Sequence, residues 1–276
     1  MSETNPGQSS PESSRAPIVV IGGLLSFKTQ WHYYIPILRG SSTRLPIKDR
    51  FLPIPNHGLG TFPEMIGELD EQLTEIHQRL EEPVVLVGQS LGALMAEKLA
   101  LSNPKRVRAV ELLAGAHDDG IRHLTATGKI LHKALGDPDT AQDLFADSDF
   151  MAEHRHDRAA NWPQRIPHRV IAPTYDDLIP APQGLQLDFP SPEHQSEIRV
   201  VKPLLPRMSF GIEGRTQGIE GIKWLRPIFP AGHMDIAICP PVVSGIHELS
   251  QSVMGSGDSQ AFNQHVSAES AVAAAA

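Results

Sequence analysis

A serine between two glycines, in the segment GQSLG at positions 88–92, has the spacing in this sequence that points most directly to chemistry. It follows the apolar run VVLV and precedes an apolar helical segment, so Ser90 is expected at a sharp strand-to-helix turn. Side chains at the two glycine positions would collide with neighbouring backbone there. At a helix N-terminus, free N–H groups favour developing negative charge. The pattern predicts a nucleophilic serine; the alternative is a glycine-flanked turn without chemistry.

A histidine late in the chain is the candidate base. Among 13 histidines, His233 lies in the segment PAGHMD at 230–235, between the last predicted strand and the final predicted helix. A loop there can bring the imidazole to Ser90, where it would act first as general base and then as general acid. His247 falls inside a predicted helix and His194 in a proline-rich segment, so both are weaker candidates.

Two adjacent aspartates, Asp176 and Asp177, follow the predicted strand at 168–174 and are the candidates for the acid that would orient this histidine. In a catalytic triad of serine, histidine and acid, the acid must be a buried, ionised carboxylate that fixes the imidazole tautomer and stabilises the imidazolium. The residues alone leave open which aspartate acts. A surface-loop histidine and two inactive aspartates remain the alternative interpretation.

The elements that must position these residues alternate along the chain. A capping-box pattern at Thr61 and Glu64 opens a helix, and further helices are expected over 91–102 and 242–253. Continuous apolar strands separated by helices indicate a parallel sheet covered on both faces, the doubly wound α/β class. The expected strands are 16–23, 50–55 (a weaker candidate suited to a sheet edge), 83–88, 107–116, 168–174 and 222–229.

From Ile18 to about Leu249 the chain resembles the α/β-hydrolase family, in its lipase/esterase branch, without the two leading antiparallel strands of larger members. The resemblance implies that the N–H groups of Leu91 and Leu24 form an oxyanion hole, although Gly22 replaces the family's usual histidine. It also selects Asp176, which stands four residues before a proline, as the triad acid, with Asp177 as its rival.

The resemblance implies a serine hydrolase of carboxylic esters that works through an acyl-enzyme on Ser90, with a small-molecule or lipid ester as substrate and no cofactor or metal. A thioesterase, acyltransferase or C–C hydrolase could use the same triad. Dehalogenation is disfavoured because the dehalogenases of the family use an aspartate nucleophile at the position where this chain has Ser90. A non-catalytic binder on a hydrolase fold is the alternative from another class.

The sequence predicts one domain over 16–254, between disordered tails at 1–15 and 255–276. An insertion at about 117–165, with helices expected at 121–135 and 140–146, is in the position of a cap; the alternative is a solvated helical decoration. Its segment EHRHD at 153–157 fits no specific metal-site spacing and is expected to be solvated. The stretch 183–221 is proline-rich and suggests no chemistry.

Composition and charge limit the partners and the cellular location that we expect. The 276 residues carry a net charge of −8, which argues against a nucleic-acid partner. One cysteine, Cys239, cannot form an internal disulfide. The sequence has no secretory signal pattern and no apolar run long enough to span a membrane, so we expect a soluble, cytoplasmic protein. The oligomeric state is left open.

Overall fold

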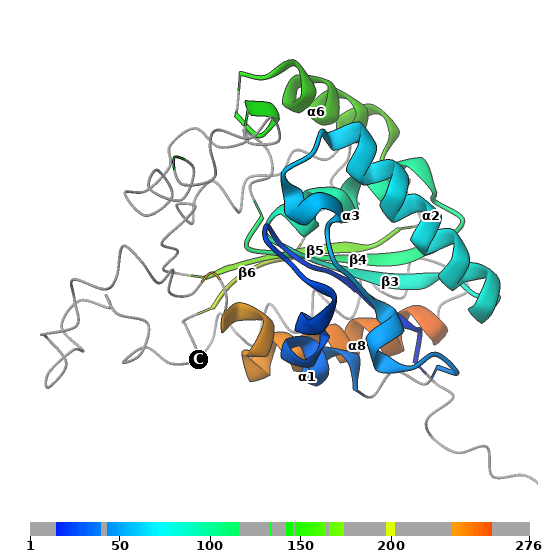
Figure 1. Ribbon diagram of the computed structural model, residues 1–276. Helices are drawn as coiled ribbons and strands as arrows, with labels where there is room; N and C mark the ends of the chain where they lie inside the picture. The colour runs from blue at the N-terminus through cyan, green and yellow to red at the C-terminus, as the bar shows by residue number, and fades with distance from the viewer. Residues whose placement is uncertain are drawn as a thin grey trace, which may run out of the picture.

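The structure is a computed structural model that describes residues 15–39, 43–115, 133, 142–145, 147–163, 166–173, 197–201, 233 and 235–255. Its centre is a parallel sheet of six strands in the order β2-β1-β3-β4-β5-β6 (Figure 1). The strands are β1 (Ile18–Ile21), β2 (Phe51–Leu52), β3 (Val84–Gln89), β4 (Val107–Leu113), β5 (His168–Pro173) and β6 (Glu197–Val201). Because all of them run in one direction, their carboxyl ends meet at the same edge of the sheet.

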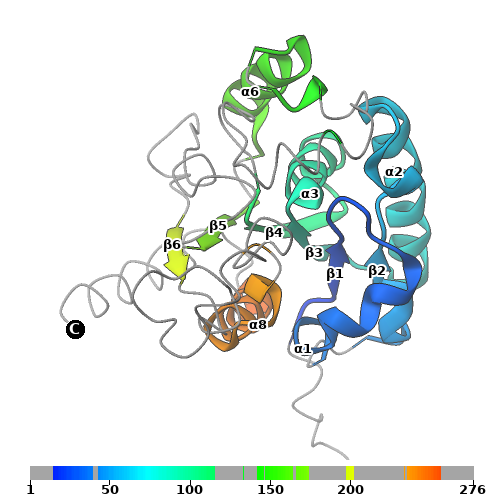
Figure 2. The same ribbon diagram turned by 60° about the vertical axis from the view of Figure 1, so that its left-hand side comes forward.

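Helices cover both faces of this sheet, which is why the central strands are apolar along their whole length. Figure 2 shows α2 (Phe62–Leu80) and α3 (Leu91–Ser102) on one face, with α6 (Asp149–Asn161) beyond α3. The opposite face carries α1 (Ile35–Leu38) and α8 (Pro240–Gly255). Alternate strand residues enter the two cores: Val19 and Leu86 face α2 and α3, whereas Val20 and Val87 face α1 and α8.

The helix α2 begins and packs as its sequence predicts. The Thr61 N–H donates to Glu64 Oε2 at 3.3 Å, one half of the expected capping box. Met65, Leu69 and Leu73 of its apolar stripe are fully buried. The next helix, α3, is buried almost all round, because it lies between the sheet, α2 and α6. This rigid layer places the N-terminus of α3 at the carboxyl edge of the sheet.

Most predicted elements are confirmed, with boundary differences of a few residues. The weak candidate at 50–55 is a two-residue strand at the sheet edge, where its prolines are tolerated. The strand β6 was not predicted, because its apolar residues lie in a stretch that we read as proline-rich and featureless. The predicted strand at 222–229, both tails and the helix expected at 121–135 lie outside the described residues, apart from Arg15, Lys133 and Gly255.

The expectation for the segment 153–157 is wrong in one respect. It lies within α6, a helix that we did not predict. Ser148 caps the start of this helix, because its hydroxyl accepts a hydrogen bond from the Met151 N–H at 3.1 Å. His154 on this helix is fully buried, and its Nε2 lies 2.7 Å from Glu97 Oε2 on α3. Arg158, also buried, donates to the same oxygen at 3.3 Å. A buried charge cluster therefore joins α6 to the helix that follows Ser90.

A second ion pair between the same helices is more exposed. Lys98 Nζ donates to Asp157 Oδ2 at 3.0 Å, and both side chains remain partly accessible. Burial alone would raise the pKa of Asp157, but hydrogen bonds from Asn161 and Lys98, together with the charge of Lys98, hold it below its ordinary value. The two pairs offer a matched comparison between buried and accessible charge.

We expect Glu97→Gln to lower the free energy of unfolding by about 3–5 kcal/mol, because it removes the carboxylate that faces a buried guanidinium and imidazole. The adjacent control Lys98→Met should cost less than about 1 kcal/mol, since its pair is accessible to water. Urea denaturation of the two variants measures both values. Equal losses would show that the buried cluster does not fix α6.

Candidate active site

The backbone of Ser90 is strained as the predicted turn requires. Ser90 lies between β3 and α3 with φ 57° and ψ −122°, a conformation that non-glycine residues rarely adopt. Its N–H donates to the Leu113 carbonyl on β4 at 2.8 Å, and its carbonyl accepts from the Ala93 N–H at 3.0 Å. These bonds hold the turn from both sides. The serine side chain therefore projects from the tip of a turn whose backbone is fixed.

Two glycines permit this turn by allowing backbone to touch backbone. A Cβ added at Gly88 would lie 2.2 Å from the Gly92 carbonyl oxygen, and one added at Gly92 would lie 2.2 Å from the Gly22 carbonyl oxygen. Neither contact can be relieved by moving a flexible side chain. The first turn of α3 is thus packed directly against the end of β1, which explains both glycines of the motif.

The loop after β1 lies against the serine. A Cβ at Gly23 would be 3.1 Å from Ser90 Cβ, so the backbone of this loop approaches the nucleophile candidate closely. The Ser26 hydroxyl accepts from the Ile54 N–H at 2.8 Å. Leu25 has a left-handed φ of 61°, and its N–H donates to the His57 carbonyl at 2.8 Å. The segment after β2 therefore holds this loop in place.

The two backbone N–H groups expected to form the oxyanion hole belong to Leu24 and Leu91. Within the described part of the chain, neither the Leu24 N–H nor the Leu91 N–H donates to a protein acceptor. Leu91 is the first residue of α3, where N–H groups have no partner inside the helix. The Leu24 and Leu91 side chains converge on Gly58, whose added Cβ would meet both within 3 Å. The two residues thus belong to one compact corner of the molecule.

His233 lies at the same corner, with 1 % of its surface exposed. Its backbone carbonyl accepts a hydrogen bond from Gln89 Nε2 at 2.9 Å, and Gln89 directly precedes Ser90. Residues 144 positions apart in the chain are thereby joined. After His233 the chain enters a short helix at Asp235–Ile238 and then α8. The structure thus brings the sequence-predicted serine, its loop and the histidine segment together.

The predicted acids, Asp176 and Asp177, lie outside the described residues. The strand before them, β5, ends at Pro173, on the same edge of the sheet as Ser90. In open parallel sheets, functional loops gather at the carboxyl ends of the strands. The topology is therefore compatible with either aspartate, and the choice between them stays a prediction.

Sequence reasoning missed two residues of this corner. Tyr34 and Gln89 are buried and hydrogen-bonded to each other beside the serine, and neither was singled out. Gln89 lies inside the serine motif, and its polar amide at the end of an apolar strand was a usable signal. Tyr34 carried no comparable signal, because its partner is 55 residues away.

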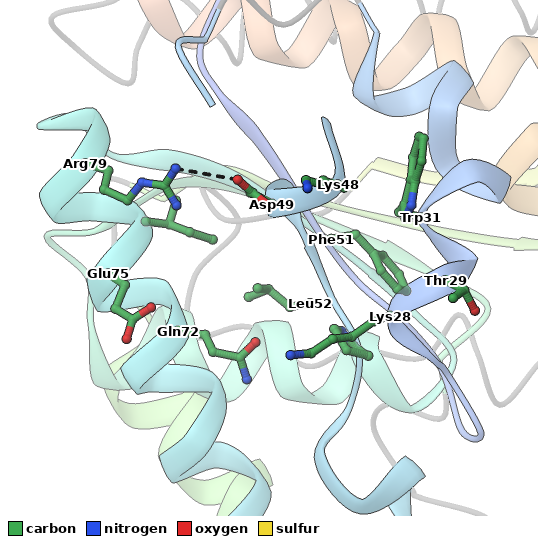
Figure 3. A pocket seen from close by; sticks show the side chains of 12 residues that line it. Lys28, Thr29, Trp31, Lys48, Asp49, Phe51, Leu52, Gln72, Glu75 and Arg79 are labelled. Carbon is green, nitrogen blue, oxygen red and sulfur yellow. Dashed lines mark ion pairs between the residues drawn. The ribbon is translucent and has the colours of Figure 1, made fainter. Parts of the chain in front are cut away.

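A hollow of about 460 Å³ opens elsewhere, beside the edge strand β2 (Figure 3). Its walls come from α2, β2 and the short helices at Lys28–Tyr34 and Ile47–Arg50, and an ion pair of 3.5 Å joins Arg79 to Asp49 there. Ser90 and His233 are not among its lining residues, so we assign it no part in the chemistry.

The residues that the structure describes contain no group of three or more potential metal ligands. None of their helices has both the length and the apolar composition needed to cross a bilayer.

Comparison with known proteins supports the fold. The sequence matches no protein-family model and resembles no curated protein in sequence. Among solved structures, Aspergillus fumigatus lipase B is similar with a TM-score of 0.57 at 14 % identity, over 90 % of this chain and 55 % of the lipase. A Bacillus subtilis protein assigned as a hydrolase is similar with a TM-score of 0.50 at 15 % identity, over 85 % of this chain and 84 % of its own. The predicted α/β-hydrolase fold is confirmed.

The glycine contacts give a direct test of the turn. Gly88→Ala or Gly92→Ala should lower the free energy of unfolding by at least about 3 kcal/mol, because the new methyl group would lie less than 3 Å from backbone atoms that cannot move aside like a flexible side chain. Gly67→Ala on α2 is the control, since nothing lies within 4 Å of its Cβ; it should stabilise the chain by about 0.5–1 kcal/mol. Wild-type stability for both Gly88→Ala and Gly92→Ala, measured by urea denaturation, would contradict the described packing.

Proposed function

We propose that this chain is a serine hydrolase that cleaves carboxylic esters through an acyl-enzyme on Ser90. In this proposal His233 carries the proton, Asp176 orients His233, and the Leu24 and Leu91 N–H groups hold the oxyanion. The observation that carries the proposal is the strained Ser90 backbone, which lies beside two N–H groups that donate to no acceptor among the described residues. Strain of this kind persists only where surrounding structure enforces it, and it is concentrated at functional sites.

Acylation begins when the Ser90 hydroxyl attacks the ester carbonyl carbon while the His233 imidazole accepts its proton. The carbonyl oxygen becomes an oxyanion, which the N–H groups of Leu24 and Leu91 stabilise. The position of Leu91 at the start of α3 adds the favourable field of the helix N-terminus. Since these donors are held by backbone packing, they need little reorganisation as charge develops.

The tetrahedral intermediate then collapses. The imidazolium of His233 gives its proton to the alkoxy oxygen, and the C–O bond breaks. The alcohol departs, and the acyl group stays on Ser90. Water attacks this acyl group with His233 again as base, and the second collapse releases the acid and restores the Ser90 hydroxyl. Asp176 would hold the imidazole in the correct tautomer and stabilise its cationic form throughout both steps.

The closeness of the histidine segment to Ser90 supports this assignment. The bond from Gln89 to the His233 carbonyl puts that backbone next to the serine turn, where a loop histidine could reach the hydroxyl. The similarity in fold to Aspergillus fumigatus lipase B agrees with an esterase-like hydrolase. Thioester hydrolysis and acyl transfer would use the same acylation step, and only the substrate and the acceptor differ.

A panel of p-nitrophenyl esters from short to long acyl chains tests the proposal. Ser90→Ala should reduce turnover by a factor on the order of 10⁴ or more, because no acyl-enzyme can form. Unchanged turnover in the variant would remove the hypothesis. The chain-length optimum of the wild type separates an esterase from a lipase, and parallel thioesters and alcohol acceptors test the other acyl reactions.

The acid is tested by paired amide substitutions. Asp176→Asn should lower turnover by about 10⁴-fold, as expected when the imidazole loses its orienting carboxylate. Asp177→Asn is the control, because it makes the same substitution at the neighbouring residue. It should leave turnover close to the wild-type value. Steady-state kinetics with one ester decides between them, and the reverse ranking would assign the role to Asp177.

A further inference from the structure

A hydrogen-bonded link passes through the residue that precedes Ser90. The Tyr34 hydroxyl donates to Gln89 Oε1 at 2.6 Å, and Gln89 Nε2 donates to the His233 carbonyl at 2.9 Å. All three residues are at most 3 % exposed. The link therefore joins the short helix at Lys28–Tyr34, the end of β3 and the segment that carries His233.

The donors and acceptors of this link can be arranged in only one way. A backbone carbonyl such as that of His233 can only accept, so the Gln89 amide must turn its NH₂ group toward it. The carbonyl oxygen of the amide then faces Tyr34, whose hydroxyl must donate. Burial raises the pKa of Tyr34 far above its ordinary value, so that proton stays in place at neutral pH. Glutamine is suited to this position because it carries a donor and an acceptor on one short planar group.

Tyr34 and Gln89, two of the three residues of the link, are anchored elsewhere in the fold. The Tyr34 ring stacks on Phe51 of β2 with 5.1 Å between ring centroids, and it meets Tyr33 edge to face. Gln89 is paired with Leu113 of β4 as the last residue of β3, so its backbone moves with the sheet. The His233 segment, by contrast, is far from both in sequence, and its backbone is tied to this rigid corner by the Gln89 amide.

We propose that Gln89 and Tyr34 are positioning residues that hold the His233 backbone in register with the Ser90 turn. The inference rests on the proposed function, since it concerns the distance over which a proton passes between Ser90 and His233. Neither residue touches the reacting atoms in this account. A displacement of about 1 Å in a catalytic group can cost about 100-fold in rate, so one amide would have a measurable effect on turnover.

Gln89→Met tests the link, because methionine keeps the length of the side chain and removes both hydrogen bonds. We expect kcat to fall by about 100-fold with KM within about twofold of wild type, since the substrate contacts are unchanged. Gln78→Met, the same substitution at an exposed position of α2, is the control and should leave both constants unchanged. Thermal melts show whether each variant is folded at the assay temperature.

Tyr34→Phe provides a second route that keeps the aromatic packing on Phe51. It should lower kcat by about threefold to tenfold, because the amide loses the donor that orients it. In the double variant with Gln89→Met, the added effect of Tyr34→Phe should disappear, since the two residues act through one link. A role confined to stability would lower the melting temperature of the variants and leave kcat of the folded protein unchanged.

The outcomes separate the two proposals. If the wild type hydrolyses no ester of the panel, or if Ser90→Ala retains its activity, the proposed function fails and the positioning role fails with it. If the wild type is active through Ser90 while folded Gln89→Met and Tyr34→Phe turn over at the wild-type rate, the positioning role alone is overturned. Additive losses in the double variant would also overturn it, because they would mean separate effects.

Discussion

The site depends on a contact between two stretches of backbone. The first turn of α3 lies against the end of β1, at a distance that leaves no room for a Cβ at Gly92, whose own carbonyl leaves none for a Cβ at Gly88 on β3. This contact fixes the strained turn at Ser90 and brings the loop after β1 beside it. Every later feature follows from that geometry, because the serine hydroxyl, the two N–H groups and the histidine segment are all positioned relative to the same turn.

Buried polar groups then fix the layers around this corner. Glu97 on α3 meets His154 and Arg158 on α6, so α6 is bound to the helix that follows Ser90. Within the sheet, Arg169 of β5 forms a two-bond ion pair with Glu111 of β4. Because a buried charge without its partner is costly, such pairs favour one arrangement of helices and strands over others.

The sequence predicted the parts of this protein that local pattern determines. Apolar runs revealed the central strands, Thr61 with Glu64 revealed the start of α2, and the glycine spacing around Ser90 revealed the turn, because each signal lies within a few residues. It did not reveal α6, whose buried face is charged and is apolar only in small part. Nor did it reveal the bond between Gln89 and Tyr34, since pairs distant in sequence leave no periodic trace. The identity of the triad acid, Asp176 or Asp177, remains a prediction from motif spacing.

Covalent labelling tests the central claim most directly, because it asks whether this one hydroxyl is activated. The wild-type chain is incubated with a fluorophosphonate, and intact mass followed by peptide mapping locates any adduct. The account predicts a single phosphonyl group on Ser90, formed far faster than on other serines and nearly absent when His233 is replaced by alanine. Absence of an adduct, or labelling of Ser90 at the same rate without the imidazole, would contradict it.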